Sequence, residues 1–254
     1  MSIELERRTK APTQPALDPW GNGHGGARSD DGFEVLDSSV EPDGSELALT
    51  GRYGTFQIRV DGRELMDSRN TVTERDLARL AFCRSANGHA PTALVGGLGM
   101  GFTLRAALDL MGPSGRVTVV EISPAVIRWN HGPLGPLARR PLADPRVELV
   151  CGDVCAVLAA RPEQFDLVLL DVDNGPHDLS LDGNRRLYSA EGLAIIGDAL
   201  RPSGIAAVWS SGPAADLEER FLQVGLSAWS ETVCPRPGDT RIRHTIVLAA
   251  RPAV

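Results

Sequence analysis

A glycine-rich turn between a short apolar strand and a helix constrains the fold of this chain more than any other feature. Residues 92–95 read as a buried strand, residues 96–101 form the turn, and residues 101–111 are typical of a helix. Glycine accepts backbone conformations that other residues avoid, so the chain can turn sharply and let a ligand lie against the backbone. A strand, a glycine turn and a helix in this order indicate a nucleoside-binding α/β unit. The glycines of the turn are Gly96, Gly97, Gly99 and Gly101.

Strands and helices continue to alternate as far as the C-terminus. The segment 165–170 is apolar on both faces, as expected of a central parallel strand. The last two strands are joined by a turn at 235–238 and are expected to form an antiparallel hairpin at the edge. This alternation predicts a doubly wound, seven-stranded, mostly parallel α/β sheet of the Rossmann-like type, with an antiparallel last strand. The expected strands are 92–95, 116–121, 147–150, 165–170, 205–209, 228–233 and 241–248.

The first 70 residues follow a different pattern. Residues 1–31 contain many prolines and glycines and bury little, so we expect a disordered tail. Residues 32–70 read as short strands in a small antiparallel appendage, with Asp61-Gly62 as a hairpin turn. A helix is expected to follow from about Glu74 to Arg84, with Thr73 as its cap. We therefore expect a tail at 1–31, an N-terminal β-hairpin region at 32–70 and a Rossmann-like domain at 71–254.

The overall composition argues against several classes of protein. The 254 residues carry a formal net charge of −7 without a basic patch, so we expect no nucleic-acid partner. No apolar stretch reaches the ~20 residues of a membrane helix, and the N-terminus lacks a signal-peptide run. The four cysteines form no CxxC pair and have no histidine at metal-ligand spacing. These features favour a cytoplasmic protein with reduced thiols, no membrane partner and no bound metal.

Acidic residues follow two of the expected strands at the edge of the sheet where the glycine turn lies. Glu121 ends the second strand of the α/β unit, where a carboxylate accepts hydrogen bonds from both ribose hydroxyls. Asp153 follows the third strand; it can accept from an adenine amino group, cap the next helix, or do both. With their neighbours Ile122 and Val154, these acids are predicted to bind a nucleoside.

The reactive end of the site is expected after the strand 165–170. Asp171 and Asp173 should face the transferable group of the cofactor, because ligands bind outside the carboxyl ends of the strands in open α/β sheets. Asp171 is a candidate general base for a substrate amine; its alternative role is to fix the loop that follows. His244, within an edge strand, is interpreted as structural. Further candidates for the acceptor pocket are Asn174, His177, Tyr188 and Trp209.

The glycine turn and Glu121 also fit an NAD-dependent dehydrogenase. That alternative explains Asp153 and the C-terminal hairpin less well, because a dinucleotide-binding fold would continue with parallel strands. A sulfonium nucleoside such as S-adenosylmethionine fits better, since paired carboxylates attract its positive charge.

Seven segments taken together resemble one family: 56–58, 65–68, 73–76, the glycine turn 96–101, 120–123, 144–147 and 152–153. They resemble the spermidine synthase-like (polyamine aminopropyltransferase) family, a branch of the class I S-adenosylmethionine-dependent methyltransferase fold. The resemblance covers residues 54–250 approximately. It implies that Gln57 contacts the cofactor, that Asp171 is the proton acceptor and that Asp173 is a looser match for an amine-binding acid. It also suggests a homodimer.

The departures from the family pattern fall on the acceptor side. Gly99 replaces the acid that the family carries in the glycine turn, and a Tyr-His pair expected after Asp76 is absent. Because an unpaired buried ammonium is costly, these losses argue against putrescine as the acceptor. We therefore expect methyl transfer from S-adenosylmethionine to a small molecule. The alternatives are aminopropyl transfer from decarboxylated S-adenosylmethionine to a polyamine, and a non-catalytic nucleoside-binding protein.

Overall fold

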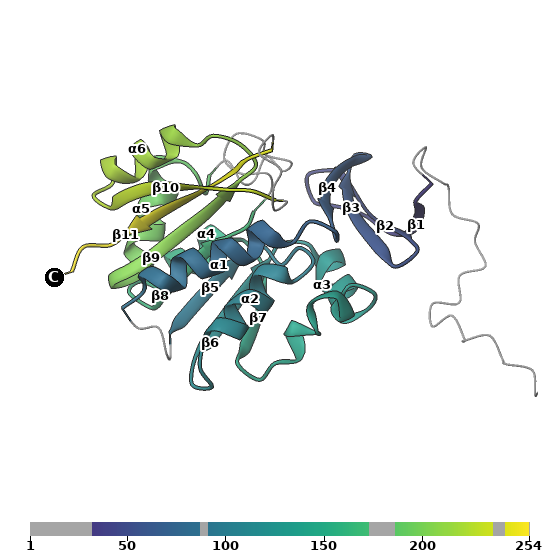
Figure 1. Ribbon diagram of the computed structural model, residues 1–254, viewed down its shortest axis with the longest axis horizontal. Coiled ribbons are helices and arrows are strands. Elements are labelled where there is room, and N and C mark those ends of the chain that lie inside the picture. The colour runs from purple at the N-terminus through teal and green to yellow at the C-terminus, as the bar shows by residue number, and fades with distance from the viewer. Residues whose placement is uncertain (1–31, 87–90, 173–185, 236–241, 254) are drawn as a thin grey trace, which may run out of the picture.

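The computed structural model describes residues 32–86, 91–172, 186–235 and 242–253. These residues form a four-stranded sheet and a seven-stranded sheet with helices on both faces (Figure 1). The tail expected at 1–31 lies outside the described residues. No helix in the described ranges combines the length and the apolar character needed to span a membrane.

The N-terminal sheet is an antiparallel meander in the order β1-β2-β3-β4, which confirms the predicted β appendage. The turn Asp61-Gly62 joins β3 to β4, and both of its residues have positive φ, at 48° and 76°. That is the conformation for which the Asp-Gly pair is suited. The strands are β1 (Glu34–Val40), β2 (Glu46–Arg52), β3 (Thr55–Val60) and β4 (Arg63–Asp67).

The large sheet has the order β10-β11-β9-β8-β5-β6-β7. β11 is antiparallel to both of its neighbours, and the other adjacent pairs are parallel. The predicted mostly parallel sheet with a reversed last strand is therefore confirmed. The strands are β5 (Thr92–Gly96), β6 (Arg116–Glu121), β7 (Val147–Cys151), β8 (Phe165–Leu170), β9 (Leu200–Ser210), β10 (Ser227–Val233) and β11 (His244–Ala250).

Two hydrophobic clusters cover the two faces of this sheet. All six residues of β8 are buried, and from Leu167 onward they alternate between the clusters, so that Leu167 and Leu169 face one layer and Val168 and Leu170 face the other. One layer contains α1 (Val72–Arg84), α2 (Phe102–Leu110) and α3 (Pro124–His131). The other contains α4 (Val154–Ala159), α5 (Ala190–Ala199) and α6 (Ala215–Gln223).

The start of α1 differs from the sequence-based expectation. We expected a helix from Glu74 with Thr73 as its cap, but α1 begins at Val72 and Thr73 lies buried inside its first turn. The Thr73 hydroxyl donates to the side chain of Glu74 at 3.2 Å rather than capping the backbone. The first turn of α1 therefore turns a carboxyl group toward the interior.

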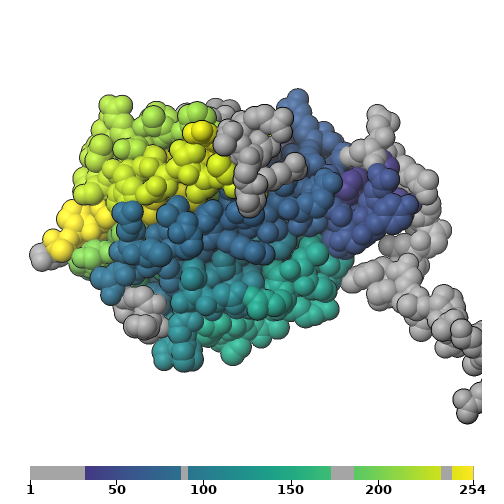
Figure 2. Space-filling view, in the orientation of Figure 1, coloured from purple at the N-terminus to yellow at the C-terminus, as the bar shows by residue number. Residues whose placement is uncertain are grey.

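The order of the strands reverses beside β5. β6 and β7 continue on one side of β5, whereas β8 and β9 continue on the other. Such a reversal opens a crevice at the carboxyl ends of the strands. The N-terminal sheet lies over this end of the large sheet and packs directly against it (Figures 1 and 2).

The turn before β7 is held by a two-point contact between Asp144 and Arg146. The guanidinium donates from Nε to Oδ1 at 2.9 Å and from Nη2 to Oδ2 at 2.8 Å. It also donates to the carbonyl oxygen of Met111 at 3.1 Å, which ties the turn to the end of α2. The bonds from Arg146 lower the pKa of Asp144 to about 2.

Asp144→Asn is expected to lower the free energy of unfolding by about 1–2 kcal/mol at pH 7, because it removes a charge-assisted pair. The folded-state pKa lies below the ordinary 3.8, so the contribution of Asp144 is complete above pH ~5 and is lost as the pH falls through 2. Urea unfolding of both proteins at several pH values tests this. A stability difference that stays constant from pH 7 to pH 2 would contradict it.

Candidate functional site

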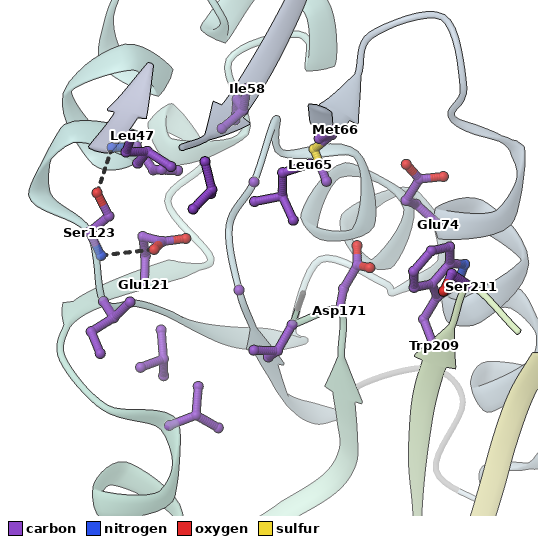
Figure 3. Close-up of a pocket in the computed structure, with 18 of the residues that line it drawn as sticks. Leu47, Ile58, Leu65, Met66, Glu74, Glu121, Ser123, Asp171, Trp209 and Ser211 are labelled. Atoms are coloured by element: carbon purple, nitrogen blue, oxygen red, sulfur yellow. Dashed lines mark hydrogen bonds between the residues drawn. The ribbon is translucent and has the colours of Figure 1, made fainter. Parts of the chain in front are cut away.

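A cavity of about 310 Å³ lies between the carboxyl ends of the large sheet and the N-terminal sheet (Figure 3). Its walls come from the loops after β5, β6, β7, β8 and β9, the inner face of the N-terminal sheet, the first turns of α1 and α3, and the start of β11. The apolar part of the wall that the N-terminal sheet contributes consists of Leu47, Ile58, Val60, Leu65 and Met66.

The glycine turn borders the cavity. Gly97 and Gly99 line it, whereas Gly96 ends β5 and Gly101 precedes α2. Gly97 has φ +83°, and a Cβ there would lie 2.4 Å from the backbone carbonyl oxygen of Asp171. Both the conformation and the close approach therefore require glycine at this position.

Glu121 ends β6 at the predicted ribose position. It is buried, and its carboxylate accepts from the backbone N–H of Leu98 at 2.9 Å and from that of Ser123 at 2.9 Å. Burial raises the pKa of Glu121, and these N–H bonds oppose the shift. These bonds hold Glu121 in place with its carboxylate at the wall of the cavity.

Asp153, Ile122 and Val154 line the same end of the cavity. Asp153 caps α4, since its Oδ1 accepts from the backbone N–H of Ala156 at 2.7 Å. Its second oxygen remains available for an amino group, so the cap and the predicted adenine contact are compatible. Ile122 is 42% exposed and offers an apolar surface to a planar base.

Asp171 follows β8 and lies on the same side of the cavity as Glu74 of α1 (Figure 3). The Thr103 hydroxyl donates to Oδ2 of Asp171 at 2.6 Å and fixes its orientation. Burial raises the pKa of Asp171. Burial and the charge of Asp171 together raise the pKa of Glu74 to about 8. The cavity therefore holds two adjacent acids that resist ionising together.

Trp209 and His244 lie close to this pair of acids. Both line the cavity, and their rings meet edge to face with centroids 4.8 Å apart. His244 Nδ1 is 3.4 Å from the Thr73 hydroxyl, and burial lowers the pKa of His244, so the ring is neutral at pH 7. His244, which we expected to be only structural, is thus part of the cavity wall.

Two predicted contacts lie elsewhere. The Gln57 amide nitrogen donates to Glu64 at 2.7 Å and to Asp67 at 3.0 Å, and Gln57 supports the cavity wall from behind instead of lining it. Tyr188 is buried in the hydrophobic layer that contains α4, α5 and α6, and its hydroxyl donates to the Val172 carbonyl at 3.4 Å. The predicted residues Asp173, Asn174 and His177 lie outside the described residues.

Known relatives of the chain include polyamine aminopropyltransferases. The chain is 29% identical over 171 residues to the enzyme of that name from Mycobacterium tuberculosis, a match that covers 66% of this chain and 31% of the relative. It is 29% identical over 119 residues to the one from Korarchaeum cryptofilum, covering 47% and 35% of the two chains. The matches thus span about a third of the length of these curated relatives. No family model matches the sequence.

Solved structures show the same fold. Spermidine synthase from Thermotoga maritima superimposes with a TM-score of 0.67 at 16% identity, over 87% of this chain and 75% of that one. A spermidine synthase in complex with the transition-state analogue AdoDATO gives 0.68 at 18% identity, over 87% and 76%. The chain is a homologue of the polyamine aminopropyltransferases, with their class I fold.

At position 99 of the glycine turn this chain has glycine where the family carries an acid, and the structure shows what lies beside that glycine. Gly99 has φ +48°, and a Cβ there would lie 2.8 Å from Cε of Met66 and 3.0 Å from its sulfur. The Met66 side chain, from β4, therefore fills the space beside the turn that a longer residue at position 99 would need.

Two site residues escaped the sequence analysis. Glu74 lies on the buried face of α1, three residues before the buried Leu77, and an acid on such a face is a signal for function. Glu41, in the turn after β1, also lines the cavity, and its Oε1 accepts from the Ser123 hydroxyl at 3.0 Å. No local pattern marked Glu41, because its position depends on how the two sheets pack.

Glu121→Gln is expected to weaken the binding of 5′-methylthioadenosine by about 10-fold or more, because one acceptor oxygen for the ribose is lost. Isothermal titration measures this affinity. Glu163→Gln, which removes an exposed partner of Arg251 before β8, is the control and should bind like the wild type. Equal affinity of all three proteins would contradict the ribose role of Glu121.

Glu74→Gln is expected to stabilise the protein at alkaline pH. The folded-state pKa of Glu74, about 8, lies above its ordinary 4.5, so wild-type stability from this group falls as the pH rises from 4.5 to 8. The variant has no such loss. Its free energy of unfolding should exceed that of the wild type by on the order of 1–3 kcal/mol at pH 8.5, with little difference at pH 5. Urea unfolding at both pH values measures the effect, and Asp76→Asn on the same helix is the control. The same difference in free energy of unfolding between Glu74→Gln and wild type at both pH values would refute this prediction.

Proposed function

We propose that this chain transfers an aminopropyl group from decarboxylated S-adenosylmethionine to a small amine. The observation that carries the proposal is the charge of the cavity. Among the described residues that line it, carboxyl side chains are numerous, and neither lysine nor arginine occurs. The acids are Glu41, Glu64, Asp67, Glu74, Glu121, Asp153 and Asp171.

This charge favours the decarboxylated nucleoside over S-adenosylmethionine. The two molecules differ in one carboxylate, which would enter a cavity that offers it no described cation and several acids. Burying a charge without a partner is costly, whereas an ammonium and a sulfonium both gain from nearby carboxylates. The homology supports the same choice, since the relatives are named as aminopropyltransferases. We therefore replace methyl transfer, which the sequence analysis ranked first, with its alternative, aminopropyl transfer.

The residues divide between the two halves of the proposed reaction. Glu121 holds the ribose, Asp153 accepts from the adenine amino group, and Ile122 and Val154 contact the base. Asp171, oriented by the Thr103 hydroxyl, takes a proton from the amine. The nitrogen then forms a bond to the carbon next to the sulfonium, the C–S bond breaks, and the electron pair remains on sulfur. The products are the alkylated amine and 5′-methylthioadenosine.

Methyl transfer from S-adenosylmethionine remains the second candidate. It is favoured by one specific observation, the occupation of the space beside Gly99 by Met66, which leaves the glycine turn without the family's acid. A methyl acceptor needs fewer acids than a diamine does, because it does not have to carry two positive charges.

The two activities leave different products. With decarboxylated S-adenosylmethionine and a panel of small amines, we expect 5′-methylthioadenosine; with S-adenosylmethionine, we expect no S-adenosylhomocysteine. Asp171→Asn should lower kcat by about 10²–10⁴-fold and leave nucleoside affinity within a few-fold. Chromatography of the nucleoside products measures both.

Either of two other results would change the assignment. S-adenosylhomocysteine formed from S-adenosylmethionine would establish methyl transfer instead. Tight nucleoside binding without turnover of either compound would leave a nucleoside-binding protein without catalysis.

A further inference from the structure

We propose that Glu74 is the second carboxylate of the acceptor site and that it contacts the ammonium group of the amine together with Asp171. The inference rests on the proposed function, because it assigns a further residue to the acceptor half of that reaction. The family resemblance gives Glu74 no role at the reacting atoms.

Glu74 lies at the end of the cavity where the amine is proposed to react. It is 7% exposed, lines the cavity on the first turn of α1, and lies near Asp171 and Trp209 (Figure 3). The Thr73 hydroxyl donates to Glu74 Oε2 at 3.2 Å and is itself 3.4 Å from His244 Nδ1. Glu74 is therefore positioned by neighbours from two elements that meet only in the folded protein.

The charges around Glu74 make it a receptor for a cation. Asp171 faces it from the end of β8, the neutral His244 from β11, and Arg75 influences it from α1. Within the described ranges, neither Glu74 nor Asp171 forms an ion pair, whereas Asp67 on β4 is already bonded to Arg69 at 2.6 Å.

Glu64, also on β4, accepts from Gln57 and completes the acidic groups that line this side. Two buried acids this close share one proton when no cation is present, as the raised pKa of Glu74, about 8, indicates. The empty pair at pH 7 therefore carries one negative charge and one proton that a bound cation can displace.

An alkylammonium ion takes the place of that proton. When it binds between the two carboxyl groups, Glu74 ionises and its proton leaves to solvent. During transfer the ammonium gives one proton to the pair, the neutral nitrogen attacks the carbon on sulfur, and the C–S bond breaks. The pair then again holds one proton, which is its state before the amine arrived, so protons and charge balance over the cycle.

Glu74 also explains how the site functions without an acid in the glycine turn. Position 99 is a glycine with the Met66 thioether beside it, so the turn presents no side chain to the acceptor there. The first turn of α1 supplies the carboxylate from another direction. The acceptor site is thus built from a helix start and a strand end.

Proton release on amine binding tests the assignment without requiring turnover. Isothermal titration of n-butylamine and of 1,4-diaminobutane into the protein saturated with 5′-methylthioadenosine, in phosphate and in Tris at pH 7, gives the number of protons released. We expect the wild type to release close to one proton per amine, and to release almost none at pH 9, where Glu74 is already ionised. Glu74→Gln should release almost none at pH 7 and bind the amines at least 10-fold more weakly.

Two further variants separate a direct role from a structural one. Glu74→Asp keeps the acid and should retain proton release, and Asp76→Asn, two residues along α1, should behave like the wild type. Unchanged affinity for 5′-methylthioadenosine shows that each variant is folded. Wild-type proton release in Glu74→Gln, or absence of amine binding by the wild type, would overturn the proposal.

The outcome can be told apart from failure of the proposed function. If amines bind with proton release that depends on Glu74 but no aminopropyl group is transferred, the proposed reaction fails and the role of Glu74 stands. If Glu74→Gln transfers aminopropyl groups with wild-type KM for the amine, the reaction stands and the role of Glu74 fails.

Discussion

The close approach of the glycine turn to the backbone after β8 is the constraint on which the rest of the site depends. The Asp171 N–H donates to the Gly96 carbonyl at 2.9 Å, and the Gly97 N–H donates to the Val120 carbonyl at 2.9 Å. These bonds join the carboxyl ends of β8, β5 and β6 at the point where the strand order reverses. A side chain at Gly97 would separate them, and the acids that follow these strands would no longer share one cavity.

The N-terminal sheet completes what the large sheet begins. The Ser123 hydroxyl donates to Glu41 across the boundary between the sheets, and the Met66 thioether lies over the glycine turn. Both contacts involve residues at the ends of strands, where the sheets meet. The cavity is therefore enclosed by packing between two sheets whose strand ladders are separate, and part of its apolar wall belongs to the smaller one.

The sequence predicts those parts of the site that depend on local structure. The glycine turn, Glu121 at a strand end and Asp153 at a helix start follow from residue type and periodicity over a few positions, and the structure places Gly97, Glu121 and Asp153 at one cavity. The acid pair was not predictable in that way, because Glu74, Asp171 and His244 come from distant parts of the chain. The sequence also places the start of this helix at Glu74, whereas Glu74 lies within the first turn of α1, on the same buried face as Leu77.

α1 is the segment that connects the two sheets, and it carries one of the two acids at the reacting end. The residues proposed to surround the nucleoside instead belong to loops of the large sheet. A change in how the small sheet sits on the large one would tilt this connecting helix and displace Glu74, while Glu121 and Asp153 stayed where they are. Substitutions at the junction between the two sheets can therefore change selectivity for the acceptor, while the residues that hold the donor are inherited unchanged.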